Sequence, residues 1–399
     1  MRIMHLIASV DPDGGGPVEY ARVMAAEHAK LGHESVFVTL DRANAAFIPQ
    51  FGFPVFGTGP GSRIPARAPG FSEKIAELAP SFDVAVVHGL WNQATISGHA
   101  ALVSAGLSWV IFPHGMLDPW FRKAKPVKHW IKQAYWMLWQ GRMLSEASTV
   151  LFTCEEERRL ARGAFVGHSK YRERVVAFCA SDQGLGPEEL DTGRASFKKQ
   201  LPALSGRAYL LFLSRIHPKK ACDQLIEAFS RIACEYPAVD LVIAGPDQTG
   251  WQVELEAMSA RLGVAGRVHW PGPLKGAAKA AAFADAHAFV LPSHQENFGL
   301  VVAEALSTGT PVLISTKVNI WREIVKAGAG LAVDDTVDAT EGMLRSFMKL
   351  DLSTVQAMRA GTRPCYDAHF SVQQAAEDLL ACLEIAVLQN SHGDPASGS

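Results

Sequence analysis

The sequence lacks the patterns that mark zinc-binding, disulfide-linked, secreted and membrane-spanning chains. Its six cysteines include no Cys-x-x-Cys pair and no His/Cys group with zinc spacing, so we expect free, buried thiols in a reducing cytosol. No uninterrupted apolar run reaches the roughly 18 residues that a membrane-spanning helix needs. The apolar start at 1–10 is too short for a secretory signal. These absences predict a cytoplasmic protein.

An excess of charge of either sign is also missing. The 38 basic and 40 acidic residues leave a formal net charge of −2, so no global electrostatic field would attract nucleic acid. Hydrophobic residues make up 48% and charged residues 20% of the chain, which is ordinary for a globular protein. At roughly 100–200 residues per domain, the 399 residues predict two or three domains.

Short apolar runs alternate with helical patterns along the chain. The runs at 2–10 and 35–40 flank a helical pattern at 17–31, which predicts a strand–helix–strand unit and a parallel sheet. The same alternation continues towards residue 180 and starts again at 209–214. The predicted fold class is α/β, with two doubly wound, Rossmann-like domains facing a central cleft. We expect domains at 1–181 and 207–371, a linker at 182–206 with room for one short helix, an amphipathic helix at 372–389 and a disordered tail at 390–399.

The strongest functional signal is the segment SHQENFGLVVAEAL, at 293–306. Glu296 stands in the loop after a predicted strand, Gly299 is at the start of the next helix, and Glu304 lies within that helix. Free backbone N–H groups at a helix start favour an anion, and Gly299 lets a phosphate approach closely. Carboxylates beside such a site suit the hydroxyl pairs of a sugar and a ribose. The segment therefore predicts a nucleotide-sugar cradle; the alternative is a helix cap at Glu296 and a solvated Glu304.

Two cations stand where another predicted strand ends. Arg215 follows the strand at 209–214 directly, and Lys220 opens the next helix. Ligands of open α/β sheets bind at the carboxyl ends of the strands, where two fixed cations would neutralise a diphosphate leaving group. The alternative is a pair of exposed surface cations.

The N-terminal half carries two weaker signals. Gly15 and Gly16 join the first strand to the first helix, but they do not form Gly-x-Gly-x-x-Gly, so a dinucleotide fingerprint is not supported. This loop either approaches a ligand or is a tight turn. His114 follows the strand at 109–112, where a histidine can orient a sugar by hydrogen bonding. The alternative is a core histidine.

The segment 120–144 is basic and rich in tryptophan. It holds six Lys or Arg residues and no acidic one, with Trp130, Trp136 and Trp139 interleaved. A basic helix with interfacial aromatic residues can lie on an anionic membrane surface. The alternative is an ordinary helix with core tryptophans and solvated lysines. The residues alone leave both interpretations open: a peripheral contact with the membrane or an ordinary helix.

Together, these motifs resemble the retaining GT-B glycosyltransferases of family 4, over nearly the whole chain. The matching pieces are the Gly15–Gly16 loop, GHESVFVT, HGMLDPW, SRIHPKK, ENFGLVVAEALSTGTPV and WREIVKAGAGLAV. The resemblance implies that the C-terminal helix crosses back to the first domain and that no metal or cofactor is needed. It implies that His114, Arg215, Lys220 and Glu296 are the catalytic group, with the two cations on the donor diphosphate and Glu296 on the donor sugar. It implies donor contacts from Gly15, Gly16, Asn297, Phe298, Gly299 and Leu300, and a ribose contact from Glu304.

The sequence departs from the family pattern in two places. The stretch VVAFCASDQGL, at 175–185, replaces the usual Ile-Pro-Asn-Gly-Val run before the linker, and Ala221 replaces a usual glycine. The resemblance implies transfer of a hexose from GDP-mannose or a UDP-sugar to a glycan or lipid-linked acceptor in surface polysaccharide synthesis. The alternatives are a nucleotide-sugar epimerase of the same fold and a non-catalytic nucleotide-sugar-binding partner of a membrane assembly. A phosphorylase is disfavoured because nothing marks a pyridoxal lysine.

Overall fold

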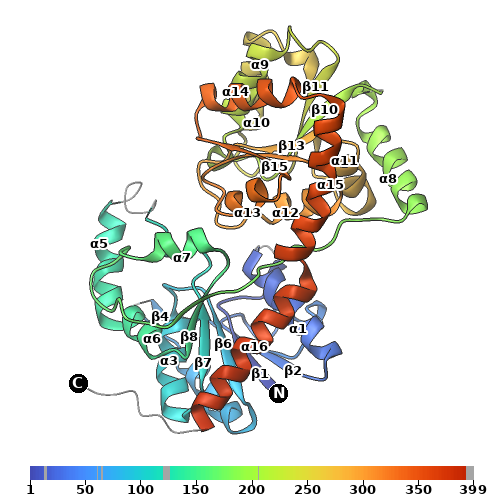
Figure 1. Cartoon of the computed structure of the whole chain (residues 1–399). Coiled ribbons are helices and arrows are strands. Elements are labelled where there is room, and N and C mark those ends of the chain that lie inside the picture. Colours follow the sequence, from blue (N-terminus) through green and yellow to red (C-terminus); the bar gives the residue numbers. More distant parts are fainter. Residues whose placement is uncertain (13–15, 61, 64–65, 120–125, 205, 392–399) are drawn as a thin grey trace. The chain divides into compact units, whose positions relative to one another are not determined.

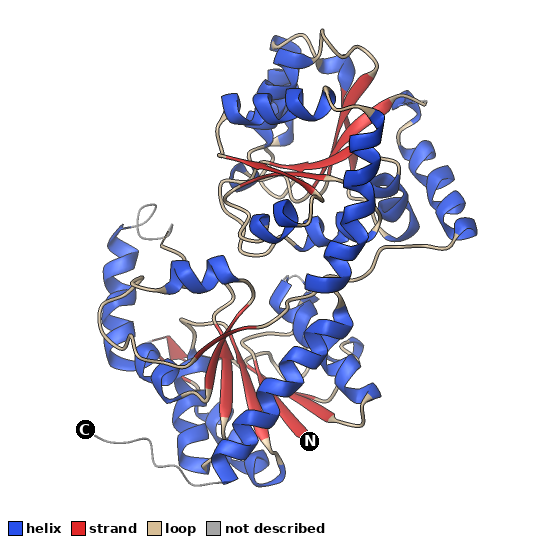
Figure 2. Ribbon diagram, viewed as in Figure 1, coloured by secondary structure: helices blue, strands red, loops and turns tan. Residues whose placement is uncertain are grey.

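The chain folds as two α/β units. The computed structural model describes all residues except 13–15, 61, 64–65, 120–125, 205 and 392–399. Unit 1 is formed by Met1–Phe178 with Val372–Ser399, and unit 2 by Cys179–Ser371. Figure 1 follows the chain through both units and Figure 2 shows their strands covered by helices. The predicted α/β class with two parallel-sheet domains is confirmed.

Unit 1 is built on a seven-stranded parallel sheet in the order β3-β2-β1-β6-β7-β8-β9. Its strands are near-continuous apolar runs, because both faces of a parallel sheet are covered; all five residues of β6 are buried. A two-stranded antiparallel hairpin, β4–β5, stands apart from it. The strands of unit 1 are β1 (Arg2–Leu6), β2 (Glu34–Thr39), β3 (Val55–Gly57), β4 (Ser62–Arg63), β5 (Ala66–Arg67), β6 (Val84–His88), β7 (Trp109–Phe112), β8 (Thr149–Phe152) and β9 (Glu173–Val175).

The last helix of the chain belongs to unit 1, where it packs against α1, β6 and β7. His28 Nε2 lies 3.0 Å from the carbonyl oxygen of Ala376, and Asp378 Oδ2 accepts a 3.0 Å bond from the amide of Ala177. The helices of unit 1 are α1 (Gly16–Lys30), α2 (Pro69–Leu78), α3 (Gln93–Ala105), α5 (Pro126–Tyr135), the π-helical turn η4 (Trp136–Gln140), α6 (Gly141–Glu146), α7 (Glu155–Ala161) and α16 (Val372–Ser391). Helix α16 includes the first two residues of the expected tail at 390–399; the others lie outside the described residues.

Unit 2 has a six-stranded parallel sheet in the order β12-β11-β10-β13-β14-β15. The strands are β10 (Ala208–Leu213), β11 (Val239–Ala244), β12 (Val268–Gly272), β13 (Ala288–Leu291), β14 (Val312–Ser315) and β15 (Gly330–Val333). The helices are α8 (Pro187–Gln200), α9 (Cys222–Ile232), α10 (Gln252–Arg261), α11 (Gly276–Ala284), α12 (Leu300–Ser307), α13 (Trp321–Lys326), α14 (Val337–Met348) and α15 (Leu352–His369).

The stretch 182–206 differs from the linker that its composition predicts. Most of it is helix α8, which packs along α11 within unit 2. Arg194 forms an ion pair of 2.8 Å with Asp285 at the end of α11, and Gly193 allows the close approach of the Ala277 carbonyl. The boundary between the units falls earlier, between Phe178 and Cys179.

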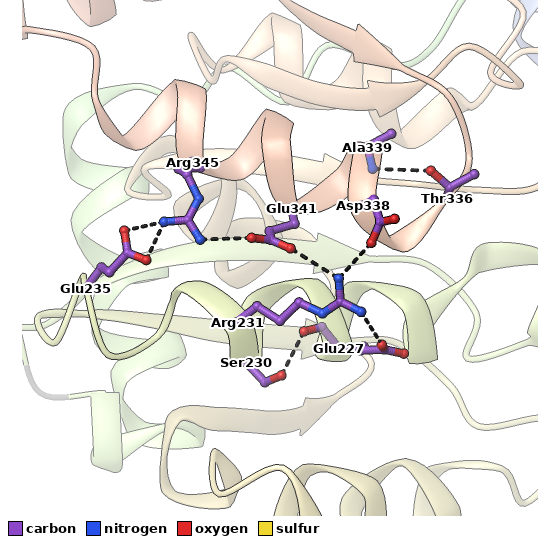
Figure 3. Close-up of polar contacts among 9 residues, drawn as sticks. All are labelled: Glu227, Ser230, Arg231, Glu235, Thr336, Asp338, Ala339, Glu341 and Arg345. Atoms are coloured by element: carbon purple, nitrogen blue, oxygen red, sulfur yellow. Dashed lines mark hydrogen bonds and ion pairs between the residues drawn. The ribbon is translucent and has the colours of Figure 1, made fainter.

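Helices α9 and α14 are joined by a network of exposed ion pairs, drawn in Figure 3. Arg231 contacts Glu227 on its own helix and Asp338 and Glu341 on α14, at 2.7, 2.8 and 3.2 Å. Arg345 returns from α14 to Glu235. Exposed pairs contribute little one by one, about 0–1 kcal/mol each, so the network fixes the alignment of the two helices more than it stabilises the unit.

Each sheet changes direction of winding at one point. In unit 1 the chain winds one way from β1 to β3 and the other way from β6 to β9, so the change falls between β1 and β6. In unit 2 it falls between β10 and β13. Ligands of open α/β sheets bind outside the carboxyl ends of the strands at such switch points. Lys220 and Glu296 follow β10 and β13, at the switch point of unit 2, whereas His114 follows β7, one strand beyond the switch point of unit 1.

Candidate active site

The switch point of unit 2 brings a cation and a carboxylate together. Lys220, seven residues after β10, contacts Glu296, five residues after β13, through Nζ and Oε2. The Lys220 side chain is 12% exposed and that of Glu296 is 21% exposed, so the pair is largely desolvated yet accessible. Arg215 stands beside them, exposed, with Nη1 3.3 Å from Gln248 Oε1. The two predicted cations and the first predicted carboxylate are therefore neighbours.

The backbone around Glu296 is held by the loop that follows β14. The Glu296 amide donates to the Lys317 carbonyl at 2.9 Å, and the Glu296 carbonyl accepts from the Asn319 amide at 3.1 Å. Gly299 then caps α12 with a φ of 78°, in the left-handed region that glycine tolerates best. A Cβ on Gly299 would lie 3.2 Å from Glu296 Cγ. The glycine of the motif is thus required by both conformation and space.

The start of α9 shows what one departure from the family pattern costs in backbone conformation. Ala221 caps this helix with φ 55° and ψ 44°, a left-handed conformation that a side chain makes costly. The usual glycine suits that conformation, and the alanine here is strained and fully buried. Burial, with the nearby charges of Arg215 and Lys219, lowers the pKa of Lys220 to about 8.

The second predicted carboxylate forms its own ion pair. Glu304 Oε1 lies 2.6 Å from Lys279 Nζ, on α11, and the two side chains are 15% and 19% exposed. Burial raises the pKa of Glu304, against the opposing effect of Lys279. The side chain of Phe298 is buried and packs edge-on against Phe370. Asn297 Oδ1 lies 3.5 Å from Asn319 Nδ2, and Leu300 is the first residue of α12.

In unit 1, His114 stands on a strained turn that a buried carboxylate holds. His114 and Gly115 have positive φ values of 51° and 73°. Glu157, which is 4% exposed, accepts the Gly115 amide at 2.6 Å through Oε1. Its Oε2 accepts both the amide and the hydroxyl of Thr153, at 2.7 and 2.6 Å. The position of His114 is therefore fixed from α7, and an unusual non-glycine φ at a strand end is typical of functional sites.

A chain of three histidines runs across the unit 1 switch point. His5 lies in β1, His88 ends β6 and His114 follows β7. His5 Nδ1 lies 3.1 Å from His88 Nε2, and His88 Nδ1 lies 3.1 Å from His114 Nε2. Burial lowers the pKa of His114 to about 3, and burial followed by repulsion from His114 lowers that of His88 well below 6.5. All three rings are therefore neutral at physiological pH.

Sequence reasoning missed His5, His88, Glu157 and Lys279. Isolated histidines at strand ends look like core residues, and a glutamate that caps backbone amides has no sequence signature beyond its charge. Gly15 lies outside the described residues, while Gly16 is the first residue of α1, directly after β1 and its loop.

The helix region predicted to meet a membrane divides in two. Trp136 is 3% exposed and donates to the Gly167 carbonyl at 2.6 Å, so it is a core residue. Trp130 and Trp139 are 74% and 41% exposed, together with Ile131, Met137 and Leu138. Of the cations, Lys132 lies over the Trp91 ring and Arg142 pairs with Glu146, whereas 120–125 fall outside the described residues. Among the described residues of this segment, the exposed side chains therefore include a group of large apolar ones.

Two broader expectations can also be compared with the structure. All six cysteines are free thiols; five are buried and Cys234 is exposed. Within the described part of the chain, none of the helices has the length and apolar character that crossing a membrane requires.

Comparisons with known proteins match both units to one enzyme class. Residues 193–363 match the family model of the glycosyl transferases group 1, and residues 15–179 match that of the glycosyl transferase 4-like domain. Two relatives are D-inositol 3-phosphate glycosyltransferases. The one from Geodermatophilus obscurus is 30% identical over 48% of this chain and 44% of its own. The one from Rhodococcus opacus is 28% identical over 60% and 54%. The matches thus span about half the length of these relatives.

Solved structures share the fold over almost the whole chain. The complex of Anabaena HepE with UDP has a TM-score of 0.76 at 19% identity and covers 96% of this chain and 100% of its own. Sucrose-phosphate synthase from Thermosynechococcus elongatus has a TM-score of 0.73 at 18% identity, covering 96% and 98%. At such identities the likeness concerns the GT-B fold, and the predicted fold is confirmed.

Proposed function

Because the chain belongs to the family-4 glycosyltransferases of GT-B fold, we propose that it transfers a hexose, with retention, from a nucleotide-sugar donor. The observation that carries this proposal is the contact between Lys220 and Glu296 at the switch point of unit 2. A cation suits the diphosphate of such a donor and an adjacent carboxylate suits the hydroxyl groups of its sugar. The two groups contact each other in the structure, so a donor would place its diphosphate on Lys220 and its sugar on Glu296 by separating them.

In the proposed reaction, unit 2 binds the donor and stabilises the diphosphate that leaves. The bond between the anomeric carbon and the diphosphate breaks, and its electron pair leaves with the diphosphate. Arg215 and Lys220 stabilise that developing charge, and the amides at the start of α12 add to it. The acceptor oxygen forms its bond on the same face of the sugar, and its proton goes to the departing phosphate oxygen. Glu304, next to Lys279, is the proposed ribose ligand.

UDP and GDP sugars both suit these residues. UDP is the first probe to use, since a structure with this fold was solved with UDP and with UDP-glucose. The acceptor proposed from the sequence is a glycan or a lipid-linked sugar of a surface polysaccharide. The names of the relatives add D-inositol 3-phosphate to the acceptors to test.

A panel of UDP, GDP and their sugars tests the donor, because a ligand that binds only the folded state raises the melting temperature. We expect either UDP and its sugars or GDP and its sugars to raise the melting temperature of the wild type. The same nucleotides should no longer raise the melting temperature of Lys220→Ala. Product analysis then separates the alternatives: conversion of the free donor without an acceptor would indicate an epimerase, and binding without turnover a non-catalytic partner. Absence of a shift with every nucleotide would contradict the proposed function. We also propose that turnover continues in excess chelator.

We propose in addition that α5 and η4 dock on an anionic membrane surface. Trp130 and Met137 are seven residues apart, as are Ile131 and Leu138, so the four lie on neighbouring positions of one helical face. Trp130 and Leu138, at 74% and 62% exposed, are among the most exposed large apolar side chains described. The six cations at 120–144 give the segment the charge that such a surface attracts.

A further inference from the structure

The histidine chain of unit 1 crosses three neighbouring strands and stacks as it does so. The His5 and His88 rings have centroids 5.4 Å apart and planes 18° apart, and the His88 and His114 rings are 5.4 Å and 10° apart. Phe37 stacks on His5 at 4.6 Å, and Phe112 stacks on His88 at 5.9 Å. The rings therefore have little freedom to rotate, and the two nitrogen contacts of 3.1 Å are held in place.

The two ends of the histidine chain, His5 and His114, differ in their exposure. At one end, His5 Nε2 is buried with no hydrogen-bond partner among the described residues. At the other end, His114 is partly exposed, and no described residue takes up its Nδ1. A proton accepted at His114 is not passed along the three histidines, because that would leave a cation at His5, whose burial lowers its pKa well below 6.5.

The two contacts also make the three rings share one tautomer. A neutral imidazole carries one proton, so each contact holds one donor and one acceptor. If His88 is protonated at Nδ1, it donates to His114 Nε2 and accepts from His5 Nδ1, and all three rings carry the proton on Nδ1. If His88 is protonated at Nε2, the same logic places every proton on Nε2. In the first state His114 Nδ1 is a donor, and in the second it is an acceptor.

We propose that His88, backed by His5, is a positioning residue that fixes the His114 ring and presents its Nδ1 to a sugar hydroxyl group. A hydroxyl fits both states of the chain because it can donate or accept. An ammonium fits only the acceptor state, and a phosphate only the donor state. His114 acts as a hydrogen-bonding group and not as a general base. The sugar hydroxyl as partner rests on the proposed function; the shared tautomer does not.

Nitrogen-15 NMR of histidine-labelled full-length protein tests the chain directly. We expect the rings of His5, His88 and His114 to show one common tautomer, with no titration between pH 5.5 and 8.5. In His88→Phe, which keeps the ring stack but removes both contacts, we expect His114 to show a mixture of tautomers. His99→Phe is the matched control, since His99 is another histidine of unit 1, paired with Glu146 and outside the chain. Different tautomers in the wild-type rings, or a charged ring at neutral pH, would overturn the proposal.

Activity provides the second readout, with UDP and UDP-glucose as probes. We expect His88→Phe to lower kcat for UDP-glucose hydrolysis about tenfold, as the loss of one positioned hydrogen bond does, while UDP binds as in the wild type. His88→Asn, whose amide can replace Nδ1, should restore most of kcat, which loss of packing would not allow. An unchanged kcat in His88→Phe would refute the positioning role. If the wild type binds neither probe, the proposed function fails, while the NMR result still decides the shared tautomer.

Discussion

Replacing Glu296 by Gln should change nucleotide binding and turnover in opposite directions. In the structure the carboxylate of Glu296 forms an ion pair with Lys220, the residue proposed to bind the donor diphosphate. A donor diphosphate therefore has to compete with Glu296 for this cation. Glutamine keeps the size of the side chain, and the backbone contacts of residue 296 to Lys317 and Asn319 do not depend on it. The fold should therefore be unaffected.

The expected magnitudes follow from the burial of the pair. Two unit charges at about 4 Å attract by about 4 kcal/mol at an effective dielectric constant of 20, but desolvation cancels most of this. For a pair that is 12% and 21% exposed, we take the upper end of the range for exposed pairs, about 1 kcal/mol. UDP should then bind Glu296→Gln about fivefold more tightly than the wild type. Loss of a charged hydrogen bond to the sugar costs about 1.5–3 kcal/mol, so turnover should fall by about 10- to 100-fold.

Isothermal titration with UDP at pH 7 and initial rates with UDP-glucose measure the two quantities on the same protein. Glu227→Gln is the matched control, because Glu227 pairs with an arginine on the exposed side of α9 and should leave both values unchanged. Weaker binding of UDP by Glu296→Gln would show that Glu296 supports the phosphate site. Wild-type turnover would remove Glu296 from the sugar site.

Three further predictions concern other parts of the chain. Ala221→Gly should raise the free energy of unfolding by about 0.5–1 kcal/mol, the relief of left-handed strain less the entropy that glycine adds to the unfolded chain; a lower denaturation midpoint would contradict the strain. Since the pKa of Lys220 is lowered to about 8, its charge is present below that pH and lost above it, so UDP should bind more weakly as the pH rises from 7 to 9; constant affinity would exclude the cation. Trp130→Gln with Leu138→Gln should weaken sedimentation with anionic vesicles, whereas Leu352→Gln, a similarly exposed apolar site in unit 2, should not; equal effects would refute the docking face.

The sequence predicts many of the strands, and the proximity of Lys220 to Glu296, for physical reasons. The predicted strand 109–112 has the bounds of β7, because strands buried on both faces are uninterrupted apolar runs. Lys220 and Glu296 could be placed together because the carboxyl ends of parallel strands share one edge of the sheet. The length of helix α8 and its packing within unit 2 could not be predicted, because the stretch 182–206 is mostly polar and α8 packs chiefly along α11.

The unit 1 site was harder to predict. His114 could be found from its position after a strand, but its partner His88 could not, since the contact depends on the register of β6 against β7. Glu157 accepts hydrogen bonds from backbone amides, which almost every residue carries, so no sequence pattern marks its role. The left-handed conformation of Ala221 is visible only as a departure from a family glycine, and its energetic meaning needs the φ value.

The order of the two units along the chain has a consequence for how such enzymes diversify and how they can be re-engineered. Unit 2 is one continuous stretch, Cys179–Ser371, whereas unit 1 is assembled from the two ends of the chain. A recombination event with two crossovers, near 178 and near 371, therefore exchanges the whole proposed donor module as a cassette. A single crossover would instead pair α16 from one parent with α1 from the other, and would disturb the contacts of His28 with Ala376 and of Asp378 with Ala177. Chimeras designed with both junctions should fold, and those with one should inherit a mismatched terminal helix.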